Sequence, residues 1–136
     1  MQRVMGLDLG ERRIGIALSD IMGIIANGHE SYTRENLNKD LEHIVSICKE
    51  KNVGLIVLGL PVSMNGTQGE AVEKVKFFAS KLAEKTDIRI DFYDERLTTS
   101  TAQKILISAD VSREKRKQVV DKMAATIILQ DYLNSH

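Results

Sequence analysis

Three things are scarce in this chain of 136 residues, and each scarcity excludes a class of protein. Cysteine occurs once, at Cys48, so no internal disulfide can form and a reducing compartment is expected. The longest uncharged apolar runs are far too short to span a membrane. Residues 1–10 also lack the basic and apolar regions of a signal peptide. We therefore expect a cytoplasmic protein that makes no contact with membranes.

The chain also has no net charge at pH 7. Nineteen basic and 19 acidic residues give a net charge of +0 and a pI of about 6.8. No global electrostatic field therefore attracts nucleic acid, and any such binding has to come from local clusters. The length predicts a single domain over residues 1–136. Its 43% hydrophobic and 28% charged residues are typical of globular proteins.

Hydrophobic periodicity predicts an α/β chain. A helix over 37–51 has Asn36 as its N-cap, and its apolar stripe is expected to leave Asp40 on another face. A strand–strand–strand start followed by alternating helices and strands predicts a mixed sheet with helices on both faces. We expect strands at about 3–9, 13–19, 24–32, 55–58 and 88–93, and further helices at about 70–84, 99–107 and from Ser112 to Leu133.

The stretch VMGLDLGERRIGIA, residues 4–17, places a carboxylate inside an apolar strand. Asp8 shares its face of that strand with Gly6 and Gly10, because residues two apart point the same way. These glycines are expected to leave open space over the carboxylate for a metal ion or a phosphate. Burying a carboxylate costs free energy unless a cation or hydrogen-bond donors compensate for it. The alternative is a hairpin in which Asp8 only accepts hydrogen bonds from turn amides.

Two more acids lie where elements end or meet. Glu95 follows the strand at 88–93, at the carboxyl end of the sheet, where ligands bind in open α/β folds. Asp121 has the helical spacing that puts it on one face with Ala124, Ala125 and Ile128, facing the sheet. If Asp8, Glu95 and Asp121 converge, their oxygens form a site for Mg²⁺ or Mn²⁺. The alternatives are surface ion pairs, of Glu95 with Arg96 and of Asp121 with Lys117 or Lys122.

Basic and hydroxyl side chains near these acids are candidate contacts to nucleic-acid phosphates. The alternative for the run from Lys115 to Lys117 is a solvated helix face. The three histidines have no ligand spacing to one another or to Cys48, so a zinc site is not expected. The candidate phosphate-binding residues are Arg12, Arg13, Arg96, Thr98 and Lys117.

Four motifs, in this order, resemble those of the YqgF/RuvX family, a group of Holliday-junction resolvases or pre-ribosomal-RNA nucleases. They are GLDLGERRIGIA, GLPVSMNGTQG, DERLTT and VVDKMAATIILQDYL. The resemblance covers the whole chain. It implies a ribonuclease H-like fold, with a five-stranded mixed sheet of order 3-2-1-4-5. It also implies a divalent-metal nuclease whose acidic positions are Asp8, Glu95 and Asp121, with a role at the 5′ end of pre-16S ribosomal RNA.

One departure from the wider superfamily concerns the strand that ends at Gly59-Leu60-Pro61, where many relatives carry a fourth acid. Two rival interpretations stay open. One is half of an ATP-binding module like those of actin and Hsp70, and the other is a nucleic-acid-binding protein without turnover. For a nuclease, the substrate is either precursor ribosomal RNA or branched DNA. The protein is then a monomer or a homodimer, because junction resolution needs two sites and end trimming needs one.

Overall fold

The computed structural model describes residues 2–61, 69–94 and 113–135, and only the backbone of residues 113–120. In chain order the elements are β1 (Arg3–Leu9), β2 (Arg13–Ser19), β3 (Ala26–Thr33), α1 (Leu37–Lys51), β4 (Val53–Leu60), α2 (Glu70–Lys85), β5 (Arg89–Asp94) and α4 (Arg113–Ser135).

The five strands form one mixed sheet in the order β3-β2-β1-β4-β5. The β1–β2 and β2–β3 pairs are antiparallel, whereas β4 and β5 run parallel to β1. The order confirms the ribonuclease H-like topology that the family resemblance implied. β5 is half-buried at one edge of the sheet, as its alternating sequence predicted.

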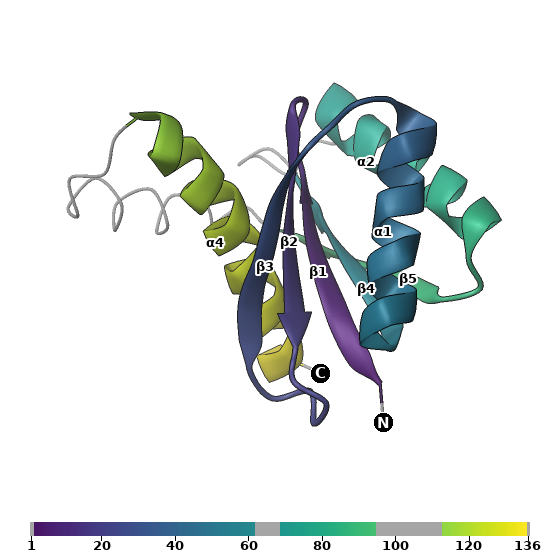
Figure 1. Cartoon of the computed structure of the whole chain (residues 1–136), viewed down its shortest axis with the longest axis vertical. Helices are drawn as coiled ribbons and strands as arrows, with labels where there is room; N and C mark the ends of the chain where they lie inside the picture. Colours follow the sequence, from purple (N-terminus) through teal and green to yellow (C-terminus); the bar gives the residue numbers. More distant parts are fainter. Residues whose placement is uncertain (1, 62–68, 95–112, 136) are drawn as a thin grey trace.

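Helices cover both faces of the sheet (Figure 1). α1 and α2 pack on one face over a core of large aliphatic side chains, among them Leu7, Ile16 and Ile56. Among the described elements, α4 is the helix that crosses the other face, where Ala125 of the helix packs against smaller strand residues such as Ala17. Cys48 is a buried member of the first core, as its place on the apolar stripe predicted.

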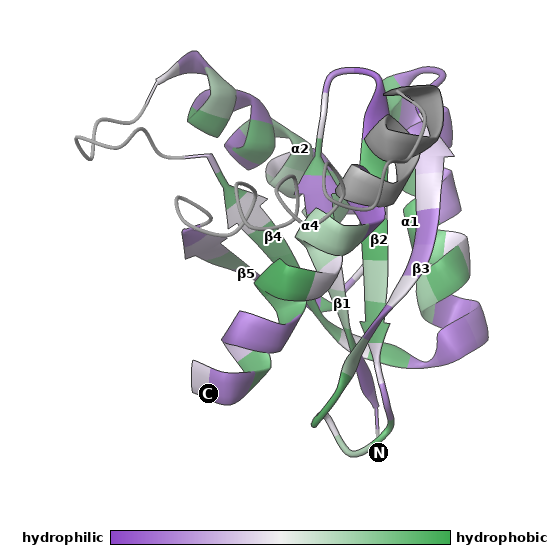
Figure 2. Ribbon diagram, turned by 90° about the vertical axis from the view of Figure 1, so that its left-hand side faces the viewer, coloured by the Kyte–Doolittle hydropathy of each residue, from purple (hydrophilic) through white to green (hydrophobic). Residues whose placement is uncertain are grey.

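Within the described residues, the predicted elements agree with the observed ones apart from the ends of two strands. β4 spans Val53–Leu60 rather than 55–58, and β3 begins at Ala26 rather than Ile24. The carboxylate of Asp20 accepts hydrogen bonds from the backbone N–H groups of Met22, Ile24 and Ile25. The bonds from Ile25 and Ile24 lower the pKa of Asp20. A loop thus replaces the first predicted residues of the strand, and Figure 2 shows this hydrophobic β2–β3 connection at one end of the sheet.

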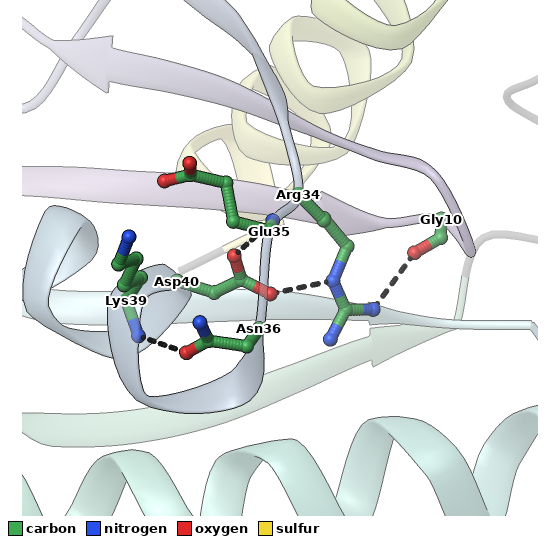
Figure 3. Close-up of polar contacts among 6 residues, drawn as sticks. All are labelled: Gly10, Arg34, Glu35, Asn36, Lys39 and Asp40. Atoms are coloured by element: carbon green, nitrogen blue, oxygen red, sulfur yellow. Dashed lines mark hydrogen bonds and ion pairs between the residues drawn. The ribbon is translucent and has the colours of Figure 1, made fainter.

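The prediction that Asp40 lies off the apolar face of its helix is wrong. Asp40 is only 1% exposed. Its carboxylate accepts hydrogen bonds from Arg34 Nε at 2.9 Å and from the backbone N–H of Glu35 at 3.0 Å (Figure 3). These donors offset the cost of burying the charge. Asn36 caps the same helix by accepting from the backbone N–H of Lys39, as predicted.

Several predictions fall outside the described residues: the helix at 99–107, the cap at Ser112 and most of the loop that precedes α2. Within the described part of the chain, no helix is long and apolar enough to cross a membrane.

Candidate metal and nucleic-acid site

A row of three residues crosses the sheet near the carboxyl end of β1. Asp8 of β1 pairs with Gly15 of β2, and Gly15 pairs in turn with Ser31 of β3. Asp8 shares its face with Gly6, whose nearest neighbours are residues of α4. The row therefore lies on the side of the sheet that α4 covers.

The glycines on this face do not leave the open space that the sequence suggested. A Cβ atom added to Gly6 would lie 2.7 Å from Leu129 Cβ, and one added to Gly15 would lie 1.9 Å from the backbone oxygen of Asp121. Gly10 is closed in as well, because its Cβ would lie 2.7 Å from the backbone oxygen of Arg13. The missing side chains let the backbone of α4 lie directly on the strands.

Asp121 is brought to the row by this close packing. The side chain is 22% exposed, and Ala124, Ala125 and Ile128 on the same helix face are fully buried. The prediction that these four residues share a face toward the sheet is therefore confirmed. Because the backbone of Asp121 sits over Gly15, which pairs with Asp8, residues 113 positions apart in sequence meet on one side of the sheet.

Among the described side chains, Asp121 forms an ion pair with a residue that the sequence did not suggest. Arg13 Nε donates to Asp121 Oδ2 at 2.6 Å, and Ser31 Oγ donates to the same oxygen at 3.3 Å. Arg13 precedes Gly15 by two residues and so lies on the same face of β2. Neither Ser31 nor this use of Arg13 was predicted. The sequence did not indicate a site role for Ser31, because the strand that carries it was predicted only approximately, at about 24–32.

Four other predicted site residues lie outside what the structure describes. Glu95, Arg96 and Thr98 lie outside the described residues, as does the side chain of Lys117. β5 ends at Asp94, which is level with Leu60 of β4. Leu58 of β4 is level with Leu7 of β1. The described part of β5 therefore ends at the same end of the sheet as Asp8, the end where the parallel strands finish.

The chemistry of this site suits a hard divalent cation. Asp8 and Asp121 supply carboxylate oxygens, and Ser31 supplies a hydroxyl, which are the ligand types that Mg²⁺ and Mn²⁺ prefer. A cation, the guanidinium of Arg13, already lies against Asp121. Among the described residues no three His, Cys, Asp or Glu side chains are grouped so that they could hold a metal ion, so Asp8 and Asp121 are two acids and not yet a full set of acidic ligands.

Hydrogen bonds from Arg34 hold the turn between β1 and β2, on the side away from α4. Arg34 donates from Nη1 to the backbone oxygen of Gly10 at 3.0 Å (Figure 3). The backbone N–H of Arg34 also donates to the backbone oxygen of Arg12 at 2.8 Å. Its Nε holds the buried Asp40. Arg34 and Asp40 therefore fix the turn that carries Arg12 and Arg13. The spacing of Asp40 from Leu37 and Ile44 would have revealed its burial.

Arg12 lies on the other side of this turn from Asp121. It lines an open hollow of about 1050 Å³ between the turn and the first residues of α1 and α2. Lys74 in this hollow pairs with Glu11 at 3.4 Å and with Glu70 at 3.8 Å. The lining holds both cations and acids, so the hollow lacks the concentrated negative charge that a metal site needs.

A family model described as RuvX, Holliday junction resolvase, matches residues 2–135. A protein of Syntrophomonas wolfei named "Putative pre-16S rRNA nuclease" is 51% identical over 132 residues, which cover 97% of this chain and 94% of that protein. A protein of Clostridioides difficile with the same name is 50% identical, again over 97% of this chain and 94% of its own length.

Two solved structures share the fold at low sequence identity. RuvC of Thermus thermophilus in complex with a Holliday junction substrate superposes with a TM-score of 0.61, at 10% identity, over 99% of this chain and 95% of that one. The yeast mitochondrial Holliday junction resolvase Ydc2 gives a TM-score of 0.57, at 13% identity, over 97% of this chain and 78% of that one. Both are structures of the ribonuclease H-like class.

Proposed function

Because the chain belongs to the RuvX family of Holliday junction resolvases, we propose that it hydrolyses phosphodiester bonds of structured nucleic acid with the help of a divalent metal ion. The observation that carries the proposal is the seating of Asp121 over Gly15, beside Asp8. Two carboxylates meeting at the carboxyl end of a strand, where ligands bind in α/β folds, are difficult to explain by stability alone.

In this proposal Asp8, Glu95 and Asp121 hold Mg²⁺ or Mn²⁺. The metal would polarise the scissile phosphate and stabilise the negative charge that builds up in the reaction. The protein contributes the positions of the acids: Asp8 on a strand buried in the sheet, and Asp121 on a helix locked against that strand. Sites built on strands and helices hold their ligands more rigidly than sites on loops.

Phosphate binding would come from basic and hydroxyl side chains, some of them in the turn between β1 and β2. Arg12 and Arg13 lie in the turn that Arg34 fastens, and Arg96, Thr98 and Lys117 are the further candidates from the sequence. With a net charge of +0, the chain must rely on these local contacts for affinity. Binding should therefore weaken steeply as salt concentration rises.

The precursor of 16S ribosomal RNA is the substrate we propose, because relatives about 50% identical over nearly the whole chain carry that name. Such a substrate implies action in the cytoplasm, and a monomer with one site is sufficient for trimming an end. The second candidate is a four-way DNA junction, which the family description and the fold of RuvC favour. Two strands are cut at a junction, so this function calls for a homodimer.

The test compares cleavage of a precursor 16S RNA fragment and of a four-way DNA junction in Mn²⁺. Asp8→Asn should lower the cleavage rate by roughly a hundredfold or more, because a metal-binding oxygen loses its charge. Binding of the substrate should survive or tighten, since repulsion of phosphate decreases.

Asp87→Asn is the matched control, because it makes the same change at an exposed carboxylate before β5, away from the site. It should cleave like the wild type. Wild-type cleavage by Asp8→Asn would exclude Asp8 from the reaction. Tight binding without cleavage of either substrate by the wild type would instead favour the non-catalytic interpretation.

A further inference from the structure

Arg13 occupies a position that a phosphate-binding arginine would not be expected to hold. Its Nε lies 2.6 Å from Asp121 Oδ2, a short charge-assisted hydrogen bond to an acid of the proposed metal site. In this state the guanidinium is engaged by the protein itself. Its positive charge also balances the charge of Asp121.

The pair is placed where it can separate. The side chains of Arg13 and Asp121 are 26% and 22% exposed, so water reaches both of them. Breaking a partly exposed pair costs far less than breaking a buried one, because each charge is solvated afterwards. By contrast, Asp40 in the pair with Arg34 is only 1% exposed, which makes that pair a permanent one.

A divalent cation would compete with Arg13 on electrostatic grounds. Arg13 lies on the same face as Asp8 and diagonally across from it, because Asp8 pairs with Gly15 two residues further along β2. A cation held between Asp8 and Asp121 would therefore lie near the guanidinium and repel it. Ser31, the other donor to Asp121 Oδ2, is neutral and experiences no such repulsion.

We propose that Arg13 exchanges partners: it holds Asp121 in the metal-free protein and turns to a substrate phosphate once a divalent cation takes over Asp121. This inference rests on the proposed metal-dependent nuclease function. The exchange would couple the two ligands, so that metal increases the affinity for nucleic acid and nucleic acid increases the affinity for metal. It would also prevent the phosphate-binding arginine from engaging nucleic acid before the metal is present.

The first measurement is Mn²⁺ binding by isothermal titration calorimetry, without nucleic acid. Arg13→Gln should bind Mn²⁺ roughly tenfold more tightly than the wild type, because the ion no longer displaces a charged partner. Arg13→Lys, which keeps the positive charge, should stay near the wild type. Arg89→Gln is the matched control at an exposed arginine at the far end of the sheet, and its affinity should not change.

The second measurement is binding of a fluorescein-labelled precursor 16S RNA fragment by fluorescence anisotropy, with and without Mn²⁺ at 4 °C. A denaturing gel checks that the probe stays intact. Wild-type protein should gain affinity when Mn²⁺ is added. The gain should shrink by roughly fivefold in Arg13→Gln, because one phosphate contact that the metal releases is missing.

The possible results separate two kinds of failure. If Arg13→Gln binds Mn²⁺ more weakly than the wild type, Arg13 orients Asp121 for the metal and the exchange is wrong, while the metal site itself stands. If the wild type shows no Mn²⁺ binding that Asp121→Asn removes, the proposed metal site fails and the exchange fails with it. An unchanged Mn²⁺-dependent gain in RNA affinity in Arg13→Gln would also overturn the exchange.

Discussion

The two faces of the sheet are packed differently. Under α1 and α2 the strands carry large side chains such as Leu7, Ile16 and Leu58, all fully buried. Under α4 they carry Gly6 and Gly15, so the helix backbone rests on the strand backbone. The first arrangement buries the most apolar area and so supplies stability. The second brings carboxylates from helix and strand together, which suggests that stability and chemistry are assigned to opposite faces.

The largest effect is expected from Gly15→Ala, which tests the closely packed face. The new methyl group would lie 1.9 Å from the backbone oxygen of Asp121, so α4 must move away. Overpacking of this kind costs about 1–3 kcal/mol of unfolding free energy. Moving an acid by about 1 Å should also lower cleavage roughly a hundredfold, measured per folded molecule.

Gly28→Ala is the control for this change. It adds the same methyl group under the same helix, but the nearest atom, the side-chain oxygen of Thr126, is 3.3 Å away and belongs to a side chain that can adjust. We expect only a small loss of stability and near-wild-type cleavage. Equal cleavage by the Gly15 and Gly28 variants would contradict the idea that the close approach of α4 to the strands assembles the site.

Almost no effect on cleavage, but a loss of stability, is expected from Leu82→Ala on the face that α1 and α2 cover. Leu82 of α2 is fully buried in the main core. Its truncation should lower the free energy of unfolding by about 2–5 kcal/mol, which urea denaturation measures. Cleavage per folded molecule should remain at the wild-type level. A specific loss of cleavage at full folding would show that the two faces are not independent.

The smallest effect concerns pH. Burial raises the pKa of the Cys48 thiol from its ordinary 9.0 to about 11. The unfolded chain loses this proton at lower pH than the folded one, so the thiol stabilises the fold fully below pH 9 and this contribution is lost as pH rises toward 11. By pH 11 the loss should amount to about 2 kcal/mol.

Urea denaturation of the wild type and of Cys48→Ala between pH 8 and pH 11 checks this prediction. The variant removes a buried sulfur 4.0 Å from the sulfur of Met5, so it should be less stable at every pH. Its stability should decline less steeply above pH 9. Tyrosines also titrate at high pH, but they do so in both proteins and cancel in the comparison.

Local signals in the sequence were sufficient for most of the fold. Apolar runs on either side of a turn identified β1 and β2, alternation identified β5, and the Asn36 cap set the start of α1. Helical spacing also placed Asp121 on the buried face of the last helix. Each of these features depends on neighbours within a few residues, where sequence patterns carry most of their information.

The remaining features of the site depend on how α4 is seated, which no local pattern encodes. A glycine beside an acid is compatible with open space for a ligand or with close packing of a helix, and only the position of α4 distinguishes them at Gly6 and Gly15. The partner of Asp121 is 108 residues away in sequence, at Arg13. Asp40 is different: its helical spacing was visible, but a charged residue was assigned to the polar face by its type.

The loop between β2 and β3 illustrates how shape and side-chain identity can be specified separately. The Asp20 carboxylate accepts hydrogen bonds from the amides of Met22, Ile24 and Ile25, and Gly23 adopts a φ of +71°. Gln130 of α4 adds hydrogen bonds to the backbone of Ile24 and Ala26, so the path of the loop is set without the side chains of its aliphatic residues. The aliphatic side chains at 21, 22, 24 and 25 are about half exposed or more. Their replacement should leave the loop intact, which makes this connection a ready scaffold for displaying grafted peptides at the end of the sheet remote from the acids.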